Sequence, residues 1–148
     1  MRVIGFSYKK ISVEKKKEID GKVEIKTDIQ VNDIKKSKND LFKDLDTLSV
    51  EYEFKIAYES GFAEILFGGT IVLLMEKKDR ELTKKIMDEW KTKKILPELR
   101  LPLLNIVFER CNLKALQLEE YTNLPTHFPT PRFTQDSQET KNKENNKK

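Results

Sequence analysis

The sequence predicts an α+β fold in which a four-stranded antiparallel sheet is followed by two helices packed on one of its faces. Three observations predict it. Apolar and polar residues alternate through much of residues 1–60, residues 62–76 are apolar on both faces of an extended strand, and apolar residues between 79 and 111 recur at helical spacing. A chain of 148 residues is long enough for one domain with a modest hydrophobic core.

The strand prediction is clearest for residues 22–32, where every second residue is apolar or β-branched: Val23, Ile25, Thr27, Ile29 and Val31. Side chains of a strand alternate between its faces, so this segment is apolar on one side only. Residues 3–13 also favour a strand, and the Asp20-Gly21 dipeptide between the two segments is typical of tight hairpin turns. We therefore expect these first two strands to pair antiparallel.

Two further strands are predicted at 48–58 and 62–76, after a polar loop at 35–46 that has room for one helical turn around Leu41. Both faces of the fourth strand are apolar, which a sheet exposed to water on one side does not tolerate. We expect helices of this domain to cover one face and another chain or a ligand to cover the other. The pair Gly68-Gly69 in the middle of this strand predicts a bulge or bend.

Two helices are predicted after the strands. Asp79 can cap a short helix over 79–92 whose apolar residues are spaced by four: Leu82, Ile86 and Trp90. A longer helix is expected from about 97 to 111, in which Pro102 lies in the first turn or introduces a kink. Its inward residues are Leu99, Leu103, Ile106, Val107 and Cys111. Asn112 is the expected left-handed C-cap, although a helical continuation from Leu113 remains open.

The C-terminal region divides into two parts. Prolines at 125, 129 and 131 predict an extended segment. Residues 134–148 contain no apolar residue and are expected to be disordered. We therefore expect one domain over residues 1–133, followed by a disordered polar tail over 134–148.

The composition excludes several kinds of protein and site. Charged residues make up 36% of the chain, with a formal net charge of +4, so much of the surface must be strongly hydrated. One Cys and one His exclude an internal disulfide, a Cys-rich zinc or iron–sulfur site and a metal site with two His. The sequence has no apolar run near eighteen residues and no signal-peptide pattern, so we expect a soluble, cytoplasmic protein without membrane insertion.

No group of residues indicates catalysis, and we expect neither an enzyme nor a metal or other cofactor. Cys111 has no His or second Cys nearby in the sequence and is expected to be a small buried hydrophobe. His127 is expected to be solvated or to have a packing role. Gly68-Gly69 precedes a strand rather than a helix, so it is no phosphate-binding loop. Acidic residues interrupt most Lys runs, so no nucleic-acid partner is expected.

The last third of the chain resembles a known family. Residues 95–100 are Ile-Leu-Pro-Glu-Leu-Arg, residues 110–118 are Arg-Cys-Asn-Leu-Lys-Ala-Leu-Gln-Leu, and residues 124–131 are Leu-Pro-Thr-His-Phe-Pro-Thr-Pro. These segments are similar to the start and end of the long helix and to the Pro-rich closing segment of SecB-like export chaperones, including archaeal-type members. The chain lacks the aromatic residue at the start of that helix, and Cys111-Asn112 and Lys114-Ala115 replace a Gly-Gly and a Pro-Pro pair.

The resemblance implies a dimer or tetramer with outer sheets and helices between subunits. It also implies an ATP-independent holdase that keeps non-native polypeptides soluble in apolar grooves, including for protein export. Carried over from the position of the family's groove, the expected peptide-binding residues are Phe62, Phe67, Ile71, Leu113, Leu116 and Leu118. Bacterial export members are acidic and engage the SecA motor, whereas this chain is basic, so a SecA partnership is not expected.

Two alternatives remain open at this stage. The chain can be a structural or adaptor homo-oligomer whose apolar strand is consumed by self-association. It can also be a chaperone dedicated to one client, such as an antitoxin. The sequence identifies neither the client nor the downstream acceptor, and it does not distinguish a dimer from a tetramer.

Overall fold

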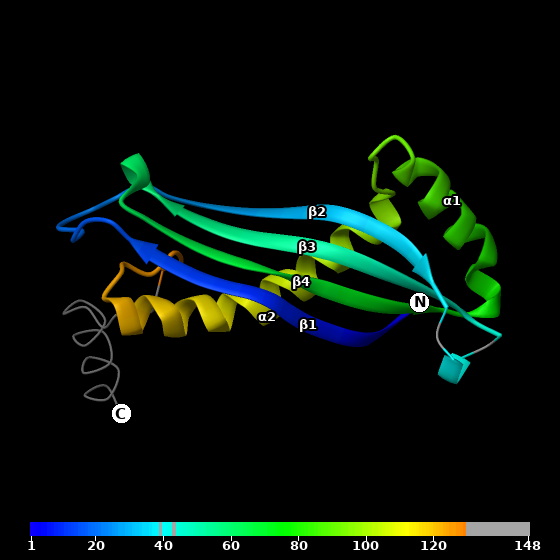
Figure 1. Ribbon diagram of the computed structural model, residues 1–148. Coiled ribbons are helices and arrows are strands. Elements are labelled where there is room, and N and C mark those ends of the chain that lie inside the picture. The colour runs from blue at the N-terminus through cyan, green and yellow to red at the C-terminus, as the bar shows by residue number, and fades with distance from the viewer. Residues whose placement is uncertain (39, 43, 130–148) are drawn as a thin grey trace, which may run out of the picture.

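The structure is a computed structural model that describes residues 1–38, 40–42 and 44–129. One sheet is formed by β1 (Arg2–Lys15), β2 (Ile25–Ser37), β3 (Asp46–Tyr58) and β4 (Ala63–Met75). Helices α1 (Arg80–Trp90) and α2 (Pro97–Thr122) follow, and 3-10 turns occupy Asp40–Phe42, Glu59–Gly61 and Lys77–Asp79 (Figure 1). The predicted α+β class is confirmed. The expected polar tail, 134–148, lies outside the described residues.

The order of strands across the sheet is β1-β4-β3-β2, and every neighbouring pair is antiparallel. The expected pairing of the first two strands is wrong, because β1 and β2 lie at opposite edges. Gly21 does adopt a left-handed conformation, with φ of 83°, but residues 16–24 carry the chain across the end of the sheet (Figure 1). A local turn signal does not select the partner of a strand; the strand that is apolar on both faces, β4, takes a central position instead.

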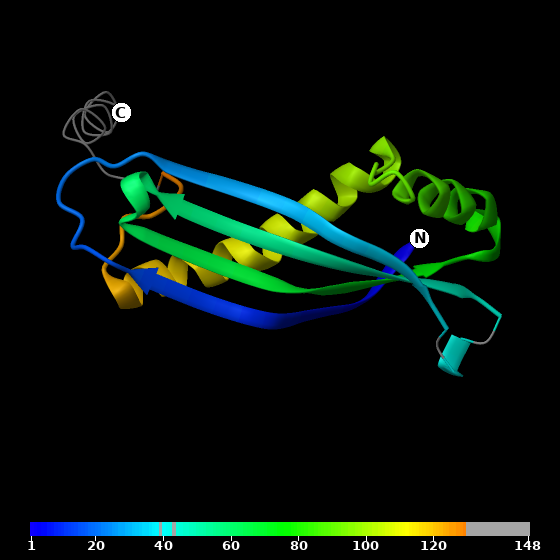
Figure 2. The same cartoon turned by 45° about the horizontal axis from the view of Figure 1, so that its top comes forward.

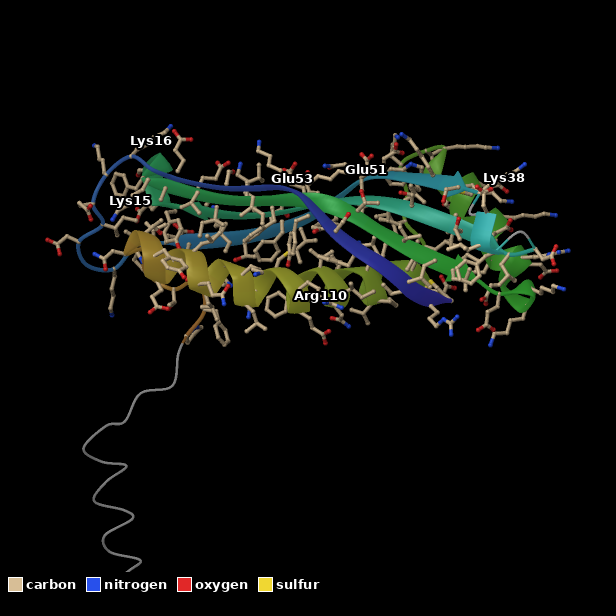
Figure 3. All side chains as sticks on the ribbon, turned by 60° about the horizontal axis from the view of Figure 1, so that its bottom comes forward. Lys15, Lys16, Lys38, Glu51, Glu53 and Arg110 are labelled. Atoms are coloured by element: carbon tan, nitrogen blue, oxygen red, sulfur yellow. The ribbon has the colours of Figure 1, made fainter. Side chains whose placement is uncertain are left out.

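The hydrophobic core lies between the sheet and α2. Alternate residues of β3 and β4 are buried on the face toward α2, among them Val50, Phe54, Ile65, Phe67 and Ile71. On the opposite face Glu51 and Glu53 of β3 point away from α2 (Figure 3). There Leu66 of β4 is only partly buried and lies opposite Lys55 in register. The outer face of the sheet is therefore mixed rather than apolar.

The bulge expected near Gly68-Gly69 lies on the neighbouring strand, since β1 changes register opposite this pair. A Cβ atom at Gly69 would lie 1.9 Å from the backbone oxygen of Ser7 and 2.7 Å from the hydroxyl of Tyr52, whereas at Gly68 the nearest atoms are 3.8 Å away. Gly69 therefore permits a close approach that no other residue allows. Because Gly69 has no side chain, the Tyr52 hydroxyl can reach the Ser7 carbonyl, to which it donates a hydrogen bond at 3.2 Å.

The buried side chains of α2 are spaced by four residues along the whole helix: Leu99, Leu103, Val107, Cys111, Ala115 and Glu119. Four residues turn an α-helix through about 400°, so the buried stripe moves about 40° around the helix at each step. This rotation fits the diagonal path of α2 across a twisted sheet (Figure 2). The predicted end at 111 is wrong, and the helical continuation from Leu113, which the sequence left open, is confirmed. The helix continues to Thr122, and the left-handed C-cap is Asn123 rather than Asn112.

Helix α1 lies beside the end of the sheet at which β2 ends (Figure 1). Ile86 and Trp90 are buried and Leu82 is half-buried, as the spacing predicted. Asp79 precedes the helix but does not cap it. Its carboxylate accepts a hydrogen bond from the backbone N–H of Glu76 at 3.1 Å and pairs with the N-terminal ammonium at 2.7 Å.

Candidate functional site

The described residues contain no cluster of three His, Cys, Asp or Glu side chains that could hold a metal ion. Cys111 is fully buried, and burial raises the pKa of its thiol to about 12, although hydrogen bonds with Tyr52 and Tyr8 oppose the shift. A thiol that is buried and protonated is no nucleophile at neutral pH. Neither described helix has the length and apolar character required to cross a membrane.

Residues 124–129, which we call the strap, fold back along α2 after its C-terminus. The side chain of His127 is 2% exposed, and its Nδ1 atom lies 2.5 Å from Oε1 of the fully buried Glu119. Its Nε2 atom contacts Oδ1 of Asn112, and its backbone N–H donates to Oε2 of Glu119 at 3.1 Å. His127 is therefore a packing residue, one of the two roles expected for it, and it anchors the strap.

The strap also contacts β3. The hydroxyl of Tyr58 donates a hydrogen bond to the carbonyl oxygen of Pro125 at 2.7 Å, and the ring of Phe54 meets the His127 ring edge-on at 6.4 Å between centroids. Burial, with the nearby charge of Glu119, raises the pKa of Tyr58, so its hydroxyl remains a donor. Leu124 is buried. The strap thus fills the space between the sheet and the C-terminal half of α2 with a non-helical, proline-containing segment.

Beside the N-terminal half of α2 the corresponding space is open. A groove of about 490 Å³, which we call the open groove, lies between β2, α2 and the connection from α1 to α2. Half of its ten lining residues are aliphatic and half-buried: Ile29, Val31, Ile95, Leu96 and Leu104. Its volume falls within the range of about 300–1,000 Å³ that is typical of ligand-binding clefts.

The strap and the open groove lie on the same side of α2. Residues spaced by four form a row next to the buried stripe, and this row contains Arg100, Leu104, Phe108 and Asn112. Asn112 contacts the strap through His127, while Arg100 and Leu104 line the open groove. Phe108, between them, is 44% exposed. One side of the helix is therefore covered by the chain itself at one end and uncovered at the other.

The end of the open groove near α1 is held firmly to β2. The Nε1–H of Trp90 donates to Oδ1 of Asp33 on β2 at 3.2 Å. Lys93 has a left-handed φ of 58°, and its N–H donates to the carbonyl of Trp90 at 2.8 Å. The Lys94 N–H donates to the carbonyl of Glu89 at 3.1 Å, which completes a Schellman motif at the end of α1. The Lys93 ammonium lies 4.6 Å from the centroid of the Trp90 ring.

A second cleft, of about 530 Å³, lies between α1 and the β2–β3 connection. Its lining combines five cations with five carboxylates, including the ion pair of Lys36 and Asp46 at 3.0 Å. Met75 and Met87 contribute apolar surface, but the balanced charges select no class of ligand. The open groove is therefore the better candidate.

The six residues expected to bind peptide do not form one surface. Phe67 and Ile71 are core residues with 0% exposure, so neither can contact a peptide in this structure. Phe62 is half-buried before β4, with the Lys17 ammonium 5.5 Å from the centroid of its ring. Leu113 is 68% exposed, whereas Leu116 and Leu118 are half-buried. None of the six lines the open groove.

Sequence reasoning missed the residues that do line the groove. The sequence places Ile29 and Val31 on the apolar face of a strand, but an apolar strand face can line a closed core as well as a groove. The available signal was the pair Ile95-Leu96. It is apolar although it lies in a connection between two helices, where polar residues are usual.

No family model matches the sequence, and no curated protein matches it significantly.

Proposed function

We propose that this protein is an ATP-independent chaperone of the holdase type, which binds extended apolar segments of non-native polypeptides in the open groove and keeps them soluble. One observation carries the proposal: the groove continues the side of α2 that the strap already covers. The strap, a non-helical segment with two prolines, is an example within the molecule of what this surface accepts. A client segment would occupy the part that the strap leaves open.

The neighbouring sheet edge supports this mode of binding. β2 has a single neighbour in the sheet, β3, so no described strand pairs with its outer edge. An added peptide strand gains main-chain hydrogen bonds that are independent of its sequence, while the aliphatic lining favours apolar side chains. Such binding needs no nucleotide. A SecB-like protein of the cytoplasm would fit both this proposal and the resemblance in residues 95–131.

The test is light scattering from a chemically unfolded protein that aggregates on dilution, with this protein in stoichiometric amounts and no nucleotide. Suppression should survive about 0.5 M salt, since apolar contacts are not screened. Leu104→Ser should weaken suppression, and Leu113→Ser, the same change on the exposed side of α2, should not. Absence of suppression by the wild-type chain would reject the proposal, and loss in Leu113→Ser alone would move the site to the outer side of the helix.

A second candidate function, a structural or adaptor homo-oligomer, is favoured by a row on the side of α2 away from the sheet. Leu101, Leu113 and Tyr121 are 64%, 68% and 86% exposed there, and their separations of 12 and 8 residues place them along one row. Self-association through this row leaves the open groove accessible. An oligomer by sedimentation that binds no unfolded chain would favour this candidate over the holdase.

A further inference from the structure

We infer that the open groove selects extended segments whose apolar residues are flanked by acidic ones. The inference rests on the proposed function and adds a substrate class to it. The apolar residues would lie against Ile29, Val31 and Leu104, and the carboxylates would lie at the end of the groove near the α1–α2 connection.

Charge complementarity carries the inference. Three cations, Lys93, Lys94 and Arg100, line this end of the groove, and Glu89 is the one carboxylate among the lining residues. All four side chains are exposed. Within the described part of the chain, neither Lys94 nor Arg100 takes part in an ion pair. A carboxylate that enters here therefore meets an excess of positive charge.

The positive end of the groove is preorganised. Lys93 is fixed by the Schellman motif and by its position over the Trp90 ring, and Trp90 is itself tied to Asp33 of β2. The Lys93 ammonium is thus held at a set position relative to the apolar wall formed by β2. Preorganised charges bind a complementary group without the cost of first ordering the loop.

The lining favours a polypeptide over a nucleic acid. Proteins that bind single-stranded nucleic acid without sequence preference combine positive charge with aromatic side chains on which bases stack. No residue that lines this groove is aromatic. The wall is aliphatic and lies beside an unpaired strand edge, which suits an extended peptide.

The experiment measures fluorescence anisotropy of labelled peptides that share one apolar core and end in three Glu, three Ser or three Lys residues. At low salt the full-length protein should bind the Glu peptide about three- to tenfold more tightly than the Ser peptide, and the Lys peptide more weakly than both. The differences should disappear at about 0.5 M salt, where such contacts are screened.

Two variants locate the effect. K94Q/R100Q should abolish the preference for Glu, so that the Glu and Ser peptides bind with equal affinity. K10Q/K85Q removes the same charge from the outer face of the sheet and from the exposed side of α1, and should retain the preference. If K10Q/K85Q loses it equally, net charge rather than the groove is responsible and the inference is wrong.

The remaining outcomes separate the inference from the proposed function. Equal binding of the Glu, Ser and Lys peptides overturns the inference and leaves the holdase intact. Failure of all three to bind overturns both. Efficient competition by an oligouridine of matched charge would instead identify an anionic nucleic-acid site and overturn the inference.

Discussion

The two halves of α2 present the same side to different surroundings. Beside the C-terminal half, the strap is tied down by the buried contact of His127 with Glu119 and by the hydrogen bond from Tyr58 to Pro125. Beside the N-terminal half, Ile29 and Leu104 are half-buried walls of the open groove. The strap therefore covers this side of the C-terminal half of α2, and the same side of the N-terminal half remains open.

The two halves differ in how their surfaces are satisfied. The covered half fixes its segment through the buried contact between His127 and Glu119, which is specific for this pair of side chains. The open half presents half-buried aliphatic walls and exposed cations. The changes described next alter either the covered end or the open end of this side of α2.

The largest difference is expected in thiol reactivity. Leu104→Cys places a thiol in the open groove, where it should react with a disulfide reagent at about pH 8 at least about a thousandfold faster than Cys111. A pKa of about 12 leaves Cys111 with about one thiolate in ten thousand at that pH, while an ordinary thiol is about one-quarter ionised. The measurement follows absorbance of the released thiol, with the wild-type chain as control. Equally slow labelling of both thiols would mean that the groove is covered.

The strap is the next target. His127→Ala should lower the free energy of unfolding by about 3 kcal/mol or more in urea, because Glu119 would remain buried without its partner. Replacing both residues by Leu should recover much of the loss, since apolar residues of similar size often substitute for a buried pair. Thr126→Ala, at the exposed neighbouring position, should change stability by less than about 0.5 kcal/mol. A stable His127→Ala variant would show that the strap is not part of the cooperative unit.

Filling the groove should separate binding from stability. Leu104→Trp should weaken binding of the Ser-terminated peptide about tenfold, or about 1.4 kcal/mol, because the indole occupies the space of the client. Stability should remain within about 1 kcal/mol of wild type, since the new side chain enters open space rather than a packed core. Leu113→Trp, on the exposed side of α2, is the matched control for anisotropy and urea unfolding. Unchanged affinity in Leu104→Trp would place the binding site elsewhere.

The smallest effect concerns the tie between α1 and β2. Hydrogen bonds with Lys35 and Trp90 lower the pKa of Asp33 below its ordinary value. The stabilisation from this carboxylate is therefore present above about pH 4 and is lost as the pH falls through the lowered pKa of the folded state. The Tm of wild type should exceed that of Asp33→Asn by a few degrees at neutral pH, and the gap should close in acid. Asp28→Asn on the exposed face of β2 should show no such gap at either pH.

Features that depend on local chemistry follow from the sequence alone. Alternation over 48–58 places β3 to within two residues, because a strand exposes alternate side chains to opposite faces. Alternation over 22–32 places the start of β2 to within three residues, but β2 continues to Ser37, into the segment predicted to be a loop. The start of α2 at Pro97 follows from the fixed φ of proline, which suits a first helical turn. The spacing of Ile86 and Trp90 likewise predicted the buried face of α1. Each of these signals is contained within a few residues.

Which surfaces meet depends on the packing of the whole chain. The turn at Gly21 does not reveal that β1 pairs with β4. Asn112 is a plausible C-cap by residue type, but α2 continues to Thr122, and its buried stripe continues to Glu119. The open groove unites Ile29 with Leu104, 75 positions later in the sequence, and its walls are aliphatic side chains that a closed core would use equally well. Local periodicity reports that a face must be covered. Which segment covers that face depends on the whole chain, because an apolar surface is buried only when a second surface packs against it.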